Sequence, residues 1–182
     1  MSPDPVAAWR ADHAYFRTLL KLLQRETDVL HSGERPNYEL MLDAISYLRD
    51  FCDRVHHPRE DVVFERLALR RPELAAALVR LHQEHRIIAQ AGEALRDLLL
   101  AALDGSVVQR ARIEVAAATY LVYYGNHIAR EDEDVAGYAA QTLTAQDWEA
   151  VRTAVPAQPD PLFGETPEAR FRALRRQIAL ES

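Results

Sequence analysis

The chain has 182 residues, enough for one domain with a substantial core, and its 48% hydrophobic and 27% charged residues are typical of globular proteins in water. The net charge of −6 offers no general attraction for nucleic acid or anionic membranes, so we expect neither partner. A single cysteine, Cys52, excludes an intramolecular disulfide and a cysteine-based metal site. No apolar run is long enough to cross a bilayer, and the first residues lack the features of a signal peptide, so we expect a cytoplasmic protein.

The first half of the chain predicts two long helices. Asp4-Pro5 is a typical helix start, and His31-Ser32-Gly33 a typical end. Between them, apolar residues recur at steps of three and four, with His13 on the same stripe. A second helix is predicted to begin after Pro36 and to run past Phe64.

The second half predicts two more helices of similar length. The third opens near Pro72 and ends at Asp104-Gly105-Ser106, and His85 lies on its apolar stripe. The inner face of the fourth is predicted to carry Ile113, Ala117, Tyr120, Tyr124, His127, Glu131, Asp134 and Tyr138. No period-two strand pattern of useful length occurs, so the fold class is all-α.

A C-terminal extension follows these helices. Thr144 is predicted to cap a short helix over 145–155, followed by a proline-rich connector over 156–167 and a basic amphipathic helix over 168–180. We predict an up-down-up-down antiparallel four-helix bundle over 1–142 and an extension over 143–182 that packs on it. The arginines of the last helix are expected to pair with carboxylates of the bundle.

Histidines and carboxylates interrupt the apolar stripe of every long helix. They are His13, His56, Glu60, His85, His127 and Glu131. A buried carboxylate without a partner costs several kcal/mol, so it pairs, shifts its pKa or binds metal. Counting residues from each turn at about 1.5 Å per residue places these side chains at one level of the bundle. The pattern predicts a metal site in the form of a pair of irons bridged by two carboxylates.

The segment His56-His57-Pro58-Arg59-Glu60 is the most specific local signal. His56 and Glu60, four residues apart, share one helix face, whereas His57 would normally point about 100° away. Pro58 lacks a backbone N–H and crowds the carbonyl of Arg54, so a kink or bulge is expected here. Such a distortion allows both histidines to face inward.

These residues resemble the hemerythrin-like family, the HHE cation-binding domain. The resemblance covers roughly residues 5–140 and rests on His13, the HHPRE segment 56–60, Glu84-His85 and the HIARE segment 127–131. It implies a four-helix bundle around a non-haem di-iron centre with an oxo or hydroxo bridge.

The resemblance also implies a ligand set. His13 and His56 would serve one iron, and His57, His85 and His127 the other, with Glu60 and Glu131 bridging the pair. Five histidines, two bridging carboxylates and one oxygen bridge fill eleven of about twelve octahedral positions. The open position, on the iron with two histidines, would admit a small diatomic or peroxide ligand such as dioxygen, nitric oxide or peroxide.

Two departures from the oxygen-transporting members leave alternatives open. His82 and His85 are three residues apart rather than four, so we expect His82 off the stripe, although it is the alternative to His57 as a ligand. Asp132 has the spacing of their last carboxylate and is the alternative to Glu131. Both departures resemble the bacterial branch and argue against oxygen transport.

Three functions remain at this point. The first is a di-iron module that binds a small ligand in oxygen, redox or iron handling. The second is a di-iron oxidoreductase that reduces nitric oxide or peroxide with an external reductant, or donates iron for repair. The third is a structural bundle with zinc or no metal. A proton donor near the open iron, such as Tyr124, would favour reduction.

Overall fold

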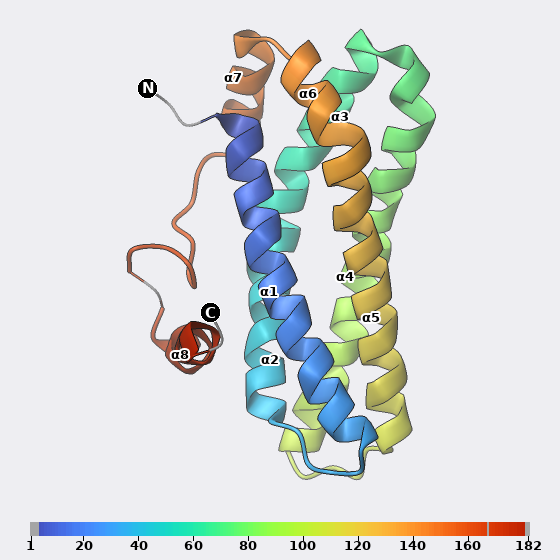
Figure 1. Ribbon diagram of the computed structural model, residues 1–182, viewed down its shortest axis with the longest axis vertical. Coiled ribbons are helices and arrows are strands. Elements are labelled where there is room, and N and C mark those ends of the chain that lie inside the picture. Colours follow the sequence, from blue (N-terminus) through green and yellow to red (C-terminus); the bar gives the residue numbers. More distant parts are fainter. Residues whose placement is uncertain (1–3, 167, 181–182) are drawn as a thin grey trace.

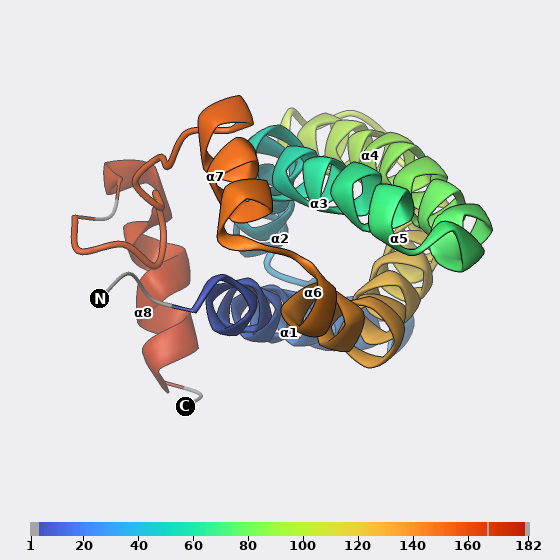
Figure 2. The same cartoon turned by 90° about the horizontal axis from the view of Figure 1, so that it is seen from above.

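The protein folds into four long antiparallel helical segments, as Figures 1 and 2 show. The computed structural model describes residues 4–166 and 168–180, and all regular structure in this part of the chain is helical. The four segments are α1 (Pro5–His31), α2–η1–α3 (Tyr38–Tyr47, Leu48–His56 and His57–Arg70), η2–α4 (Pro72–Leu74 and Ala75–Leu103) and α5–η3–α6 (Arg110–Arg130, Glu131–Val135 and Ala136–Thr142). The predicted all-α bundle is confirmed.

Local sequence determines where the segments begin and turn. The Asp4 carboxylate accepts a hydrogen bond from the Val6 N–H at 3.0 Å, and Pro5 starts α1 as predicted. Gly33 and Gly105 have φ angles of 93° and 80°, a region that glycine enters without the steric cost of a Cβ. These glycines lie in the turns after α1 and α4, so both predicted helix ends are confirmed.

Two of the four segments contain a π-helical stretch. The first, η1, ends at His56, just before the bulge-forming Pro58 that the sequence indicated. The second, η3 (Glu131–Val135), was not predicted, and it corrects the expected inner face of the fourth segment. Because a π turn takes up an additional residue, Asp134 and Tyr138 are exposed, while Val135 and Ala139 are buried in their place.

The C-terminal extension packs along one side of the bundle. Helix α7 (Ala145–Ala154) contacts α3, and α8 (Arg172–Leu180), preceded by η4 (Ala169–Phe171), contacts α2. Figure 2 shows both helices outside the ring of four. Arg170 pairs with Asp50 at 3.3 Å, the kind of contact expected for the basic tail.

The core is divided into two apolar clusters. One contains Trp9, Val63, Leu81 and Val135, and the other contains Phe16, Val55, Ile88 and Tyr124. Along each long segment, the histidines and glutamates predicted to bind metal fall between a member of the first cluster and a member of the second. The polar layer is therefore enclosed by apolar packing on both sides.

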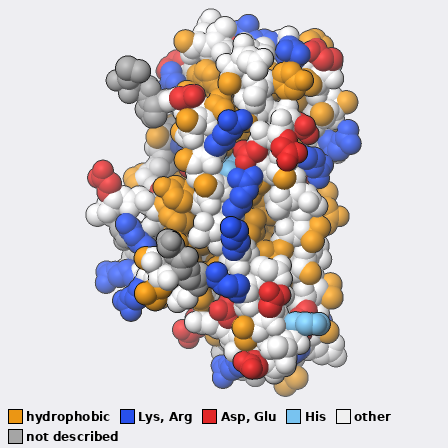
Figure 3. All heavy atoms as spheres, in the orientation of Figure 1, with side chains coloured by type: hydrophobic (Ala, Val, Ile, Leu, Met, Phe, Trp, Pro, Cys, Tyr) orange, Lys and Arg blue, Asp and Glu red, His pale blue; other side chains and the backbone are white. Residues whose placement is uncertain are grey.

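Charged and hydrophobic side chains share the outer surface. Figure 3 shows a column of Lys and Arg side chains along one face, with Asp and Glu side chains beside it. In the described part of the chain, no helix combines the length and the apolar character needed to cross a membrane.

Candidate metal centre

The four long segments bring all seven predicted ligand residues into one buried layer. They are His13 from α1, His56 from η1, His57 and Glu60 from α3, His85 from α4, His127 from α5 and Glu131 from η3. Each side chain is buried, and the most exposed, His85, retains only 6% of its accessible surface. Imidazoles and carboxylates of this number do not gather in a core by hydrophobic packing alone.

The end of η1 explains how consecutive histidines both reach the layer. In the widened turn, the His57 N–H donates to the Cys52 carbonyl, five residues back, instead of to Asp53. His56 and His57 are each 4% exposed. Their ring centroids lie 6.1 Å apart, so both rings face the interior from neighbouring positions. The predicted distortion at Pro58 therefore has the expected effect on His57.

Each of the five imidazoles contacts a carboxylate through its Nδ1 atom. The pairs and their N···O distances are His13 with Asp132 (2.9 Å), His56 with Asp12 (3.1 Å), His57 with Asp53 (3.2 Å), His85 with Asp61 (2.8 Å) and His127 with Glu84 (3.1 Å). A carboxylate acceptor at Nδ1 fixes the ring orientation and leaves Nε2 as the metal-facing atom.

Four of these pairs form a closed ring around the bundle. Asp12 of the first segment contacts His56 of the second, and Asp61 of the second contacts His85 of the third. Glu84 of the third contacts His127 of the fourth, and Asp132 of the fourth returns to His13 of the first. Each long segment thus orients a histidine of the next, and we call this set the carboxylate ring.

The Nε2 atoms point inward at Glu60 and Glu131. His13 Nε2 lies 3.1 Å from Glu60 Oε1 and 3.4 Å from Glu131 Oε2. His56 Nε2 lies 2.8 Å from Glu60 Oε1. His85 Nε2 lies 3.3 Å from Glu60 and 3.7 Å from Glu131, while His127 Nε2 lies 3.1 Å from Glu131. The two glutamates therefore occupy the centre of the layer.

Many of these inward atoms make no hydrogen bond of acceptable geometry to any described residue. They are the Nε2 atoms of His56, His57, His85 and His127, Oε2 of Glu60 and both carboxylate oxygens of Glu131. Buried polar atoms normally have a partner, and leaving one without costs about 1–3 kcal/mol. Atoms of this chemistry, converging on one point, fit a metal ion that would complete their bonding.

Burial and charge pairing act in opposite directions on the pKa values of the layer. Burial alone would raise the pKa of Glu131, but His127 and His13 outweigh it and lower the pKa to about 2. Burial alone would lower the pKa of His13, yet Asp132, Glu131 and Glu60 raise it to about 11. Burial dominates for His57 and lowers its pKa to about 4. A cation binds carboxylates and neutral imidazoles, so the two glutamates and His57 are ready to act as donors, whereas metal binding at His13 would displace a proton.

Six of the seven predicted ligands fall into two groups that share Glu60, and Glu131 belongs to neither group. His57, Glu60, His85 and His127 form one group, and His13, His56 and Glu60 form the other. Within each group the potential ligand atoms lie within 4.8 Å of one another.

A comparison with known families agrees with this geometry. A family model described as the hemerythrin HHE cation binding domain matches residues 4–139. The chain belongs to the hemerythrin HHE family. The matched range holds every residue of the polar layer and ends before α7. No curated protein matches the chain significantly.

The two residues that the sequence offered as alternative ligands lie at the edge of the polar layer. His82 is partly exposed, and its Nδ1 contacts Asp61 at 2.8 Å, on the outer side of His85. Asp132 bonds outward to His13 Nδ1 and Arg17 instead of facing Glu60. Glu131, by contrast, is fully buried at the centre.

Two further buried groups lie next to the layer. The Tyr124 ring is 5.6 Å from the His57 ring, and its hydroxyl is buried beside the Cys52 thiol. Burial, followed by the nearby Cys52 thiol, raises the pKa of Tyr124 well above its usual value. Burial likewise raises the pKa of Cys52, and a thiol with a raised pKa is a poor nucleophile.

The sequence analysis did not predict that four outer carboxylates would orient the histidines of the polar layer. These are Asp12, Asp53, Asp61 and Glu84. A local signal was present, because Asp12, Asp61 and Glu84 each adjoin a residue of the polar layer in the sequence. Asp53 lies four residues before His57 on the same helical segment.

Proposed function

We propose that the polar layer holds two iron ions and binds a small ligand such as dioxygen, nitric oxide or peroxide. His13 and His56 would hold one ion, His57, His85 and His127 the other, and Glu60 and Glu131 would bridge them. The observation that carries this proposal is the pair of ligand groups sharing Glu60, with metal-facing atoms that make no hydrogen bond of acceptable geometry to a described residue. Membership of the hemerythrin HHE family supports it.

The donor set favours iron. It consists of imidazole nitrogens and carboxylate oxygens without sulfur, which suits iron in a helical bundle. Five nitrogens and four oxygens supply nine donors, so two octahedral ions would keep three positions for other ligands. Because one group has two histidines and the other three, the two-histidine ion would be the more accessible. Bound iron would supply that open position and two accessible oxidation states.

The protein's own residues would shield such a ligand from water. Trp9 and Phe16 lie on either side of His13, with ring centroids 6.0 and 6.2 Å from the imidazole. Both side chains are buried. The Trp9 indole N–H also donates to Glu60 Oε1, so this residue positions a central carboxylate as well as covering it.

Tyr124 supports a second candidate function, the reduction of nitric oxide or peroxide with an external reductant. Its hydroxyl remains protonated because burial raises its pKa, and the Cys52 thiol lies next to it. A buried O–H beside His57 is a suitable proton donor for a reduction.

Metal content and absorbance of freshly purified protein test the main proposal. We expect about two irons per chain, with near-ultraviolet and visible bands that change when air reaches the reduced protein. Bands that persist indicate reversible binding, whereas rapid decay that slows in Tyr124→Phe indicates turnover. One zinc ion per chain, or no metal, would overturn the proposal.

A further inference from the structure

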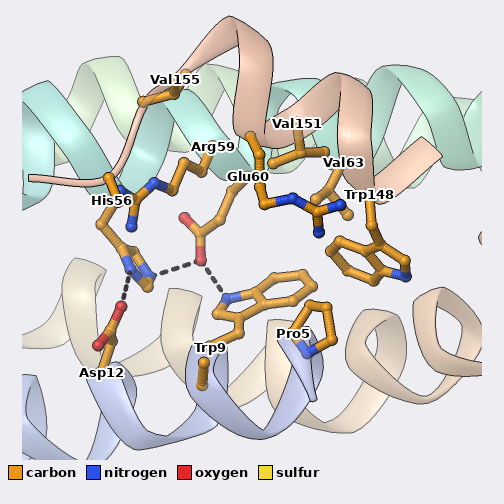
Figure 4. Close-up of a pocket in the computed structure, with 13 residues that line it drawn as sticks. Pro5, Trp9, Asp12, His56, Arg59, Glu60, Val63, Trp148, Val151 and Val155 are labelled. Carbon is orange, nitrogen blue, oxygen red and sulfur yellow. Dashed lines mark hydrogen bonds and ion pairs between the residues drawn. The ribbon is translucent and has the colours of Figure 1, made fainter. Parts of the chain in front are cut away.

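A pocket of about 360 Å³ opens beside the two-histidine group. Figure 4 shows it between α1, which supplies Pro5 and Trp9, α3, and the α7 region. Its inner wall includes His56 and Glu60, which belong to the polar layer. The pocket therefore connects the outside of the bundle with the more accessible part of the proposed centre.

The C-terminal extension builds the outer wall of this pocket. Trp148, Val151 and Val155 line it, and all three lie beyond residue 139, where the family match ends. Trp148 is half-buried and faces the region of Trp9 across the opening, as Figure 4 shows. This wall is consequently a feature of this chain and not of the matched domain.

The pocket is too large for a diatomic molecule. Its volume falls in the range of about 300–1,000 Å³ that is usual for small organic ligands. Two indole rings and three valines, with Val63 as the third, make most of its lining apolar. The body of a matching ligand is therefore apolar, with roughly the length of a medium aliphatic chain or one aromatic ring.

The charges of the lining favour an anion. Asp12 and Glu60 already contact His56, at 3.1 and 2.8 Å. Arg152 pairs with Glu149. Arg59, in contrast, has no ion-pair partner within residues 4–166 and 168–180, and its one recorded hydrogen bond goes to the Pro156 carbonyl at 3.2 Å. Its half-buried guanidinium is the cation left to receive a ligand.

The geometry points to a binding site for a small organic carboxylate in this pocket. The carboxylate contacts Arg59, and the apolar body lies between Trp9 and Trp148. A bound molecule of this class covers the approach to His56 and Glu60 from the side of α7. It would thereby control which small ligands reach the proposed centre, although its own binding requires no iron.

Intrinsic fluorescence reports directly on this site, because Trp9 and Trp148 are the only two tryptophans of the chain. We would titrate the full-length protein with octanoate, 1-octanol and octylammonium, which share an apolar body and differ in charge. Octanoate is expected to give a saturable change and to bind at least about tenfold more tightly than octylammonium. That ratio corresponds to one charge-assisted hydrogen bond.

Two arginine variants distinguish binding at this site from nonspecific hydrophobic binding. Arg59→Met should weaken the binding of octanoate about tenfold and leave the affinity for 1-octanol unchanged. The unchanged affinity for 1-octanol would also show that the pocket is still formed. Arg66→Met is the matched control, because Arg66 is half-buried on the same helix, two turns further on, and does not line the pocket. Equal octanoate affinity in the two variants, or equal affinity of the wild type for all three probes, would overturn the inference.

Iron loading distinguishes this inference from the proposed function. The titration is repeated on iron-loaded and chelator-treated protein, and Arg59-dependent octanoate binding in both samples supports the pocket site. Octanoate binding that requires iron and is unaffected by Arg59→Met would place the carboxylate on the metal. That result would overturn the inference. If the protein purifies without iron and takes up none on loading, yet binds octanoate through Arg59, only the proposed iron centre is rejected.

Discussion

The two histidines of α4 show how position decides the role of a residue. His82 and His85 each place Nδ1 2.8 Å from the same oxygen of Asp61. Only His85 turns its Nε2 atom towards Glu60 and Glu131, while His82 stays partly exposed. Because His82 lies three residues before His85, and not four, it falls outside the inner face of the helix. His85 is therefore a candidate ligand, and His82 is not.

This pair provides a matched test of the ligand set. His85→Ala should lower the iron content well below two per chain and destabilise the loaded protein, because it removes a donor from a buried cluster. His82→Ala should leave the iron content near the wild-type level. Metal analysis of both purified variants checks the prediction, and equal iron content in the two would contradict the assignment.

At the scale of single residues, the sequence predicts that the seven inner side chains lie together in the core. It does not predict most of the outer carboxylates that contact the Nδ1 atoms of the histidines. His13 and Glu131 are conspicuous because a polar residue on an apolar stripe breaks the pattern. Asp12 and Asp61 do not break it, since a charged residue beside the stripe is typical of a solvated face. Their partners lie on a neighbouring segment, and periodicity within one helix contains no information about that contact.

At the scale of the helix, the two π turns differ in how far the sequence announces them. Pro58 signals the first, because it cannot continue the normal hydrogen-bond pattern. The second, Glu131–Val135, contains no proline or glycine, and the α-helical period therefore placed Asp134 on the inner face. Glu131 itself keeps the α-helical register, because its N–H donates to the His127 carbonyl, so the widened turn shifts only the residues that follow it. The shift buries Val135 and Ala139 against other segments, and periodicity within one helix contains no information about that packing.

The second π turn makes one deletion tolerable. Removing Glu133, which is exposed, should convert η3 to a regular α-helical turn and keep both flanking registers. Removing Val122, exposed in a regular part of α5, should rotate the rest of the helix by about 100° and prevent folding. Circular dichroism and thermal unfolding compare the two. Equal loss of helix in both variants would contradict this explanation.

The start of α7 allows a pH prediction. Thr144 and Asp147 cap each other, and hydrogen bonds from Thr144 and Arg70 outweigh burial and lower the pKa of Asp147 below its ordinary 3.8. Thr144→Ala should cost about 1 kcal/mol of unfolding free energy at pH 7. A carboxyl whose pKa is lower in the folded protein than in the unfolded chain stabilises the fold at pH values above its unfolded pKa. The stability difference between wild type and Thr144→Ala should therefore shrink as the pH falls through the pKa of Asp147 in the folded protein. Urea unfolding at several pH values measures it, and a pH-independent difference would argue against the capping carboxylate.

At the scale of the whole molecule, the extension belongs to the same core as the bundle. Leu162, Phe171 and Leu174 are each at most 2% exposed and join the larger apolar cluster. Tyr47 of α2 donates to Asp160 at 2.8 Å, and its ring meets Phe171 edge to face at 5.8 Å. The helices of the extension were predictable from their caps and stripes. Where they dock was not, because docking depends on contacts between distant segments.

Substitutions in the last helical stretch test this docking. Phe171→Ala should destabilise the protein by about 3–5 kcal/mol, as for other large buried aromatic residues. Leu180→Ala, at a side chain that is 76% exposed, should change stability by less than about 0.5 kcal/mol. Chemical unfolding of both variants checks the difference. A stability loss of less than about 1 kcal/mol for Phe171→Ala would show that the extension is only loosely attached.

The carboxylate ring has a consequence for how the protein is made. Its closing contact joins His13 to Asp132, which are 119 residues apart in the chain. During synthesis, the N-terminal third of the chain leaves the ribosome with four of the seven inner residues, and one of them, His13, still lacks the carboxylate of the fourth segment that orients it. We therefore expect metal loading of the proposed centre to follow the docking of the fourth segment, because a cation captured earlier would have an incomplete set of donors.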